Sequence, residues 1–224
     1  MKDTVLLTYI IFDLLFAIMG TVMLITALAM QSQITKPPNL DNIAKNLILS
    51  SCPLKAAIAN GILVLSTFLL SIPAIAMPRA RGLLKLTGYF VFVCAVFTMV
   101  IGLNIWFETL KTRKNLLDIW TVQDVSTQSL LQTKFKCCGY TNSTSPPFVV
   151  DNICPDPTIA AARLGCVFPF SAFANGFLDI IFTAIFGIVG VDALFILATA
   201  ILLKDRKEQA RYRQIFEKKS GQGF

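Results

Sequence analysis

Hydrophobic residues fall into four long stretches along the chain, and polar residues concentrate in the segments between them. The predicted spans lie in residues 1–30, 56–77, 86–107 and 170–203. A helix of about 20 residues crosses the hydrocarbon core of a bilayer, and each stretch is long enough to do so. Backbone groups in hydrocarbon must bond within their own segment, so the pattern predicts four transmembrane α-helices.

The first stretch has an alternative interpretation as a signal peptide. Lys2 precedes it, and Ala27-Leu28-Ala29 would serve as a cleavage site. However, the apolar part of a signal peptide usually covers about 7–15 residues, and this stretch is longer and contains Asp13. We therefore favour a retained span.

Basic residues are concentrated at the N-terminus, in the link 78–85 and in the tail 204–224. Because basic residues near span ends mark the cytoplasmic side, both termini are predicted to be cytoplasmic. Residues 31–55 then form a small extracellular loop and residues 108–169 a large one. The sequon Asn142-Ser143-Thr144 in the large loop fits this topology as a glycosylation site. The expected location is the plasma membrane, with endosomal or vacuolar membranes as further locations.

Helical periodicity continues in both loops. In the small loop it predicts a short amphipathic helix after Pro37-Pro38. The apolar residues of this helix are Leu40, Ile43, Ala44, Leu47 and Ile48.

In the large loop, the third span is predicted to continue as a helix to about Trp120. A second helix would carry Leu131, Phe135 and Cys138 on one face, and a third would run from about Thr158 to Leu164.

Composition excludes several kinds of chemistry. The 224 residues are 55% hydrophobic and 15% charged, and they include no His. Without His there is no Ser-His-Asp or Cys-His catalysis and no His-bound haem, so we expect no enzyme. The net charge of +7 is divided between the two membrane faces, which argues against nucleic-acid binding.

The most specific motif is Cys137-Cys138-Gly139, followed by Cys154 and Cys166. Adjacent cysteines rarely bond each other, because a disulfide needs particular side-chain directions. Two neighbours can instead hold two separate segments at one point, with a sharp turn at Gly139. Four cysteines allow three pairings, and spacing alone does not choose among them.

With this motif, the chain resembles the tetraspanin family, which has four spans, cytoplasmic termini and a Cys-Cys-Gly motif in the longer outer loop. The family's Gly-Cys pair before the last span is matched by Gly165-Cys166. The resemblance implies the disulfides Cys137–Cys166 and Cys138–Cys154. It also implies an all-α membrane protein of four transmembrane helices with a small disulfide-stapled, mostly helical extracellular domain. The implied function is non-enzymatic organisation of other membrane proteins by lateral association.

The resemblance is closer to fungal tetraspanins associated with host penetration by infection structures, or appressoria. The shared segments are Cys137-Cys138-Gly139-Tyr140, Gly190-Val191-Asp192-Ala193 and residues 203–208. This implies a role in polarised growth or host penetration, with an NADPH oxidase as partner. Cys52 and Cys94 do not lie at the cytoplasmic span ends where many tetraspanins are palmitoylated, so acylation is not expected to cluster this chain.

Four polar residues interrupt the spans: Asp13, Asn60, Asn104 and Asp192. Asp13 and Asp192 have similar predicted depths, so their carboxyl groups could meet if the first and fourth spans are neighbours. In the family, corresponding polar residues line a cavity for a sterol or other lipid, the only cofactor we expect. Alternatively, the carboxyls pair with Asn60, Asn104 or the backbone and hold the bundle together. Glycines such as Gly20 and Gly88 favour close helix packing.

Intramembrane carboxylates also suggest a second function, a small four-helix transporter or channel. Against it, the sequence lacks the matched inverted repeats that many transporters contain.

For the organiser function, the candidate partner surface is the turn-rich part of the large loop, with Phe148, Val149 and Val150 as exposed candidates. The alternative, favoured for at least two of these residues, is a small core beneath the loop.

Overall fold

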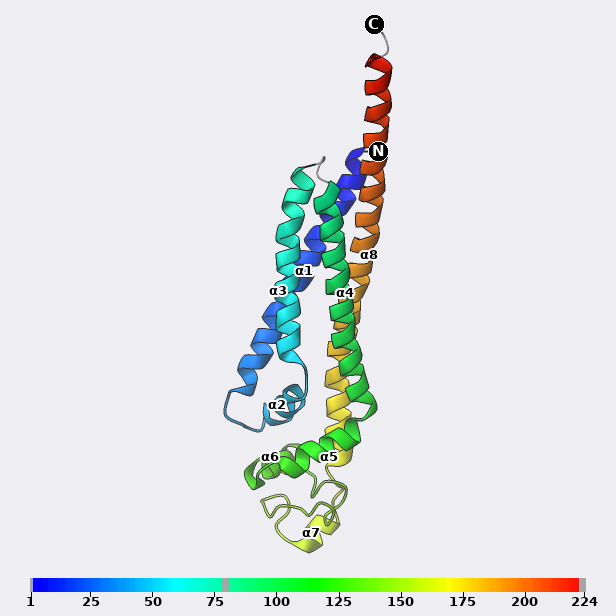
Figure 1. The fold of residues 1–224 in the computed structure, drawn as a ribbon. Helices are drawn as coiled ribbons and strands as arrows, with labels where there is room; N and C mark the ends of the chain where they lie inside the picture. Colours follow the sequence, from blue (N-terminus) through cyan, green and yellow to red (C-terminus); the bar gives the residue numbers. More distant parts are fainter. Residues whose placement is uncertain (1, 78–80, 222–224) are drawn as a thin grey trace. The chain divides into compact units, whose positions relative to one another are not determined.

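A computed structural model describes residues 2–77 and 81–221, which form eight α-helices (Figure 1). These are α1 (Lys2–Ile34), α2 (Ile43–Ser50), α3 (Leu54–Ala76), α4 (Arg81–Leu110), α5 (Thr112–Val122), α6 (Val125–Phe135), α7 (Pro157–Ala161) and α8 (Val167–Gly221). Helices α1, α3, α4 and α8 are long and apolar enough to cross a membrane. The predicted all-α fold with four transmembrane helices is therefore confirmed.

The chain divides into two compact units. The bundle unit contains Met1–Thr26, Lys55–Val100 and Ile185–Phe224, and the loop unit contains Ala27–Leu54 and Ile101–Ala184. Residues 78–80 of the predicted cytoplasmic link and residues 222–224 of the predicted tail lie outside the described residues.

Within the bundle unit, α1 contacts α8 and α3. The ring of Phe195 lies 5.3 Å from the ring of Tyr9 and 5.1 Å from that of Phe16, centroid to centroid. On α3, the Val64 side chain occupies the space that a Cβ atom at Gly20 would need. Small residues thus let these helices approach closely, as expected for packing in lipid.

Helix α4 contacts both α3 and α8. Asn60 of α3 donates a hydrogen bond of 2.8 Å to the Thr98 hydroxyl of α4. A Cβ atom at Gly88 of α4 would lie 3.3 Å from the Thr199 methyl carbon of α8. Helices α1, α3, α4 and α8 therefore contact one another in a closed ring.

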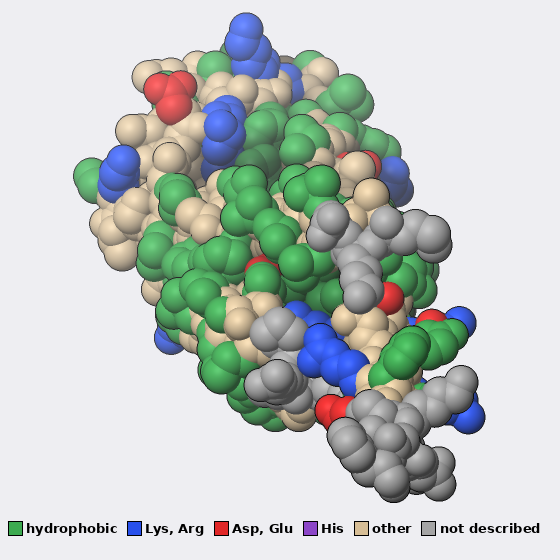
Figure 2. Space-filling model, turned by 90° about the horizontal axis from the view of Figure 1, so that it is seen from above, with side chains coloured by type: hydrophobic (Ala, Val, Ile, Leu, Met, Phe, Trp, Pro, Cys, Tyr) green, Lys and Arg blue, Asp and Glu red, His purple; other side chains and the backbone are tan. Residues whose placement is uncertain are grey.

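Large apolar side chains also cover the outside of the spans. On α1, Leu7, Ile18 and Ile25 are 57%, 55% and 60% exposed. Hydrophobic side chains make up much of the face seen in Figure 2. An apolar surface of this kind suits helices whose surroundings are lipid tails.

Within the loop unit, α2 packs against α6. The Lys134 ammonium group on α6 donates hydrogen bonds to the backbone carbonyls of Leu40 and Asp41, at 2.6 and 3.1 Å. The Asp124 carboxylate caps the start of α6 by accepting from the Thr127 amide. The small and large loops are therefore joined directly.

Several helix boundaries differ from those predicted. The third span does not continue unbroken to Trp120, because α4 ends at Leu110 and α5 begins at Thr112. The hydroxyls of Thr109 and Thr112 bond carbonyls in the preceding turn, at 2.6 and 2.7 Å. Between the two helices, the backbone of Lys111 leaves the helical conformation, with φ of −111° and ψ of 16°.

The shorter helices were also predicted inexactly. The buried face of α2 includes Leu49, whereas Leu40 precedes the helix and is exposed. Helix α7 ends at Ala161, because the Ala162 amide is shared between the carbonyls of Thr158 and Ile159 in a tightened last turn. Helix α8 continues through the predicted start of the tail as one uninterrupted helix.

Candidate functional site

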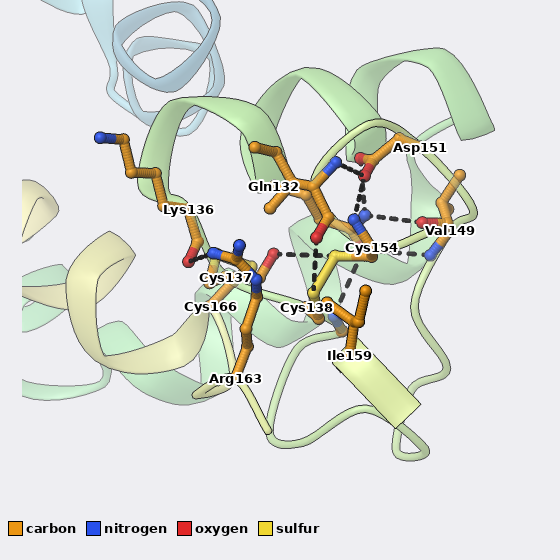
Figure 3. The surroundings of a disulfide bond; sticks show 12 residues. Gln132, Lys136, Cys137, Cys138, Val149, Asp151, Cys154, Ile159, Arg163 and Cys166 are labelled. Carbon is orange, nitrogen blue, oxygen red and sulfur yellow. Dashed lines mark hydrogen bonds between the residues drawn. A yellow bond between two sulfur atoms is a disulfide. The ribbon is translucent and has the colours of Figure 1, made fainter. Parts of the chain in front are cut away.

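Two disulfides lie in the loop unit, and Figure 3 shows the surroundings of one of them. Cys137 is bonded to Cys166 and Cys138 to Cys154, which are the pairs that the family resemblance implies. All four cysteines are buried. Two adjacent residues thus anchor the start of α8 and the segment before α7 at one point.

Gly139 and Gly165, the two motif glycines, allow neighbouring backbone segments of the loop to pass close together. Gly139 has φ of +69°, and a side chain there would strike the Asn142 carbonyl. A side chain at Gly165 would strike the carbonyls of Tyr140 and Thr141. The Cys166 amide bonds the Gly139 carbonyl at 3.0 Å, so the two halves of the motif are joined by backbone as well as by sulfur.

Gln132 is the polar centre of the loop unit, and sequence reasoning missed it. The side chain is fully buried on α6. Its amide nitrogen donates to the Val149 carbonyl and the Asp151 carboxylate, both at 2.8 Å. Its amide oxygen accepts from the backbone amides of Gly139 and Val149, at 3.2 and 3.0 Å. The sequence carried no signal that distinguishes Gln132, because all three residues between Leu131 and Phe135 are polar.

Asp151 carries this network to the second disulfide (Figure 3). One carboxylate oxygen accepts from the amides of Ile153 and Cys154, at 2.8 and 2.7 Å. The other accepts from Gln132 and from the Ser129 hydroxyl. The segment between Val149 and Cys154 is therefore held by side chains of α6.

Tyr140, which follows the motif, joins the loop to α5. Its ring lies 5.7 Å from that of buried Trp120, and its hydroxyl donates to the Arg113 carbonyl at 2.6 Å. Burial of the phenol raises the pKa of Tyr140 to about 12. The hydroxyl therefore stays protonated and acts as a donor at physiological pH.

The predicted partner-surface residues do not lie together on the surface. Phe148 is half-buried against the small core of Cys138, Cys154 and Ala160. Val149 is also half-buried, whereas Val150 is 71% exposed. The exposed apolar side chains on this part of the loop unit also include Ile159 and Leu164, at 41% and 76%.

The sequon asparagine lies on the surface. The Asn142 side chain is exposed, and its carbonyl oxygen accepts from the Thr144 amide and hydroxyl, at 3.0 and 2.9 Å.

The polar residues of the spans do not pair as predicted. Asp13 is buried and accepts a 2.5 Å hydrogen bond from Ser71 of α3. Asp192 lies beside Thr98 of α4, but the Thr98 hydroxyl donates to the Cys94 carbonyl at 2.9 Å, and neither carboxylate oxygen of Asp192 has a hydrogen-bond partner. The similar depths inferred from sequence took no account of which helix each side chain faces, and the two carboxyls do not hydrogen-bond each other.

The two asparagines also differ from the alternative prediction. Asn60 bonds Thr98 rather than a carboxylate. Asn104 belongs to the loop unit and is exposed. Neither asparagine therefore holds the bundle together by pairing with Asp13 or Asp192.

Arg206 is a second residue whose role was not predicted. It is 7% exposed, and its guanidinium group donates to the carbonyls of Ala74 and Ile75, at 2.8 and 3.4 Å. These carbonyls belong to the last turn of α3, where helical partners are missing. Arg206 of α8 therefore caps α3 with a charge of favourable sign.

Metal binding finds no support among residues 2–77 and 81–221, where no group of three His, Cys, Asp or Glu residues is suited to hold an ion.

Comparison with known families gives one match. The model of the tetraspanin family matches residues 5–205, which include all four spans and both loops. No curated protein and no solved structure matches the chain.

Proposed function

Because the chain belongs to the tetraspanin family of non-enzymatic membrane organisers, we propose that its loop unit binds the partner proteins that it assembles laterally in the membrane. The exposed apolar side chains of Val150, Ile159 and Leu164 carry this proposal. Val150 lies on the segment that Gln132 and the Cys138–Cys154 disulfide hold. Ile159 lies on α7, and the Leu164 carbonyl, two residues before Cys166 of the other disulfide, accepts a hydrogen bond from the Cys138 amide. Exposed apolar side chains on a rigid support are suited to protein recognition.

The test replaces these three side chains and keeps the frame. A Val150→Ser/Ile159→Ser/Leu164→Ser variant should lose proximity labelling of its membrane partners, while its disulfides stay intact on non-reducing gels. The matched control is Val122→Ser/Val125→Ser, which changes two other exposed valines of the loop unit. If the triple variant labels its partners as strongly as the control variant does, the partners bind elsewhere.

The proposed partner is an NADPH oxidase, and the proposed setting is polarised growth or host penetration by a fungal appressorium. The support is the resemblance in Cys137-Cys138-Gly139-Tyr140 and in the segments around Asp192 and Arg206. Proximity labelling at a penetrating infection structure, followed by mass spectrometry, should recover the oxidase. Normal penetration by a strain lacking the chain would contradict this role.

We further propose a plasma-membrane location, with endosomal or vacuolar pools, and cytoplasmic termini. The distribution of basic residues supports this orientation. It predicts that Asn142 is glycosylated, since that side chain is exposed. Glycosidase treatment should increase gel mobility of the wild type and not of Asn142→Gln. Protease access to terminal tags on intact cells would contradict the orientation.

A bound sterol or other lipid remains a proposal for the bundle unit, with Asp13 and Asp192 as contacts for a lipid hydroxyl. The unpartnered oxygens of Asp192 support it. Photo-crosslinkable sterol should label the wild type more than a folded Asp13→Leu/Asp192→Leu variant. The transporter or channel alternative gains no support from the two carboxyls, because they face different helices.

A further inference from the structure

The break between α4 and α5 forms an open hollow of about 480 Å³ on the loop unit. Its lining includes Lys111, Arg113 and Lys114, and its polar floor includes Thr112 and Asn175. The three cationic residues are exposed, whereas Thr112 is buried and donates a 2.6 Å hydrogen bond to the Asn175 side chain. The hollow therefore combines a fixed floor with a cationic rim.

Nearby acidic charge is directed away from this hollow. The Glu108 carboxylate accepts a 2.5 Å hydrogen bond from Asn115 and lines a different pocket, together with Cys52. Arg113 is held in place because its guanidinium lies 5.2 Å from the centre of the Phe168 ring and its carbonyl binds Tyr140. The positive charge at the rim is thus not neutralised by Glu108.

The hollow also lies at the end of a membrane span. Trp106 and Phe107, on the last turns of α4, are 39% and 55% exposed, and Leu110 is 62% exposed. Aromatic side chains gather where the hydrocarbon meets the headgroups, and Phe107 precedes Lys111 by about 6 Å of helix. The exposed apolar side chains of Phe107 and Leu110 therefore lie next to the cationic hollow, where an acyl chain could contact them.

From this arrangement we infer that the α4–α5 hollow binds the phosphate headgroup of an anionic phospholipid in the leaflet on the loop side. The phosphate lies among Lys111, Arg113 and Lys114, and the acyl chain lies along Phe107 and Leu110. Arginine and lysine are well suited to a phosphodiester, which they bind through charge-assisted hydrogen bonds. This site is separate from Asp13 and Asp192 and does not depend on partner binding.

Trp106 provides an internal reporter for the test. The full chain is reconstituted in phosphatidylcholine nanodiscs that contain either brominated phosphatidylglycerol or brominated phosphatidylcholine at equal fractions. Bromine quenches tryptophan on contact, so brominated phosphatidylglycerol should quench the wild type more strongly. The preference should disappear in Trp106→Phe. If it persists, the lipid lies near Trp120 instead and the assignment is wrong.

The matched variants are Lys111→Ala/Lys114→Ala and Lys45→Ala/Lys55→Ala, which remove the same charge at exposed lysines. The first should lower the preference about fivefold per lysine removed, and the second should retain it. Equal quenching by both lipids in the wild type, or equal losses in the two variants, would overturn the site. Inorganic phosphate at matched ionic strength should leave the preference unchanged. If it abolishes the preference, the hollow binds a free anion and not a lipid.

Discussion

The Gln132 side-chain amide donates a 2.8 Å hydrogen bond to the Asp151 carboxylate, joining α6 to the segment that leads to Cys154. Gln132 uses its other donor and its acceptor on backbone groups of Gly139 and Val149. A single buried amide thus orders both the Cys-Cys-Gly turn and the chain that the second disulfide holds. Disulfides limit the separation of the segments, and this network fixes their conformation.

Replacing Gln132 with Leu should therefore destabilise the loop unit although all four cysteines remain. The amides of Gly139 and Val149 would lose a buried acceptor, and unsatisfied buried groups cost about 1–3 kcal/mol each. Hydrogen exchange of the full chain should show faster exchange at both amides. Ser129→Ala, which removes one outer bond to Asp151, should cost only about 0.5–1.5 kcal/mol. Unchanged exchange in Gln132→Leu would contradict the role assigned to this amide.

The spans were predictable from sequence because hydrocarbon allows little besides a long apolar helix. The role of Gln132 was not predictable in the same way, since its hydrogen-bond partners are backbone carbonyl and amide groups that only the folded turn brings close to it. Helix ends were missed for a related reason. The helical pattern of residues continues across Lys111, although the backbone there leaves the helical conformation.

Cys52 should be an unreactive thiol. Burial, and then the charge of Glu108, raise the pKa of Cys52 from 9.0 to about 11. At pH 8 its thiolate fraction is about a hundredfold lower than that of an ordinary thiol, so iodoacetamide should react slowly in the folded chain. Mass spectrometry of the alkylated peptide gives the rate, with the denatured chain as reference. Glu108→Gln should increase the rate.

The raised pKa of Cys52 also determines how the stability of the fold changes with pH. The unfolded chain ionises Cys52 near pH 9 and the folded chain only near pH 11. Its contribution to stability is therefore fully present below pH 9 and is lost as the pH rises towards 11. Thermal unfolding of wild type and Cys52→Ser across this range measures the difference. An equal decline in both would exclude Cys52 as the cause.

Gly20 should tolerate no side chain while Val64 is present. A Cβ atom at Gly20 would overlap the Val64 side chain, and overpacking costs about 1–3 kcal/mol. Gly20→Ala should lower the thermal midpoint in detergent, and Val64→Ala in the same chain should restore part of it. Gly187→Ala is the control, because no atom lies within 4 Å of a Cβ placed there. Purely additive effects in the double variant would contradict direct contact.

The carboxyls of the spans show where sequence depth is an incomplete guide. From sequence, Asp13 and Asp192 could meet because their distances from the span ends are similar. Ser71 instead faces Asp13 from α3, and Thr98 lies beside Asp192 on α4. The depth of a residue in the membrane follows from its position along one helix. The direction of its side chain depends on how the four helices are rotated against one another.

Asp192 and Asp13 should therefore respond oppositely to replacement by Leu. Asp192 is 1% exposed and has no hydrogen-bond partner, and a buried polar group without a partner costs about 1–3 kcal/mol. Asp192→Leu should raise the thermal midpoint of the purified chain in detergent free of sterol. Asp13→Leu should lower it, because the Ser71 hydroxyl would lose its 2.5 Å bond between α3 and α1 and keep only its bond to the Phe68 carbonyl of its own helix. Asp13→Asn, which keeps an acceptor for Ser71, should recover part of that loss.

If Asp192→Leu is instead destabilising, the carboxyl makes a stabilising bond, and repeating the measurement with added sterol would distinguish a lipid hydroxyl from Thr98. A midpoint that rises with sterol in the wild type and not in Asp192→Leu would identify the lipid.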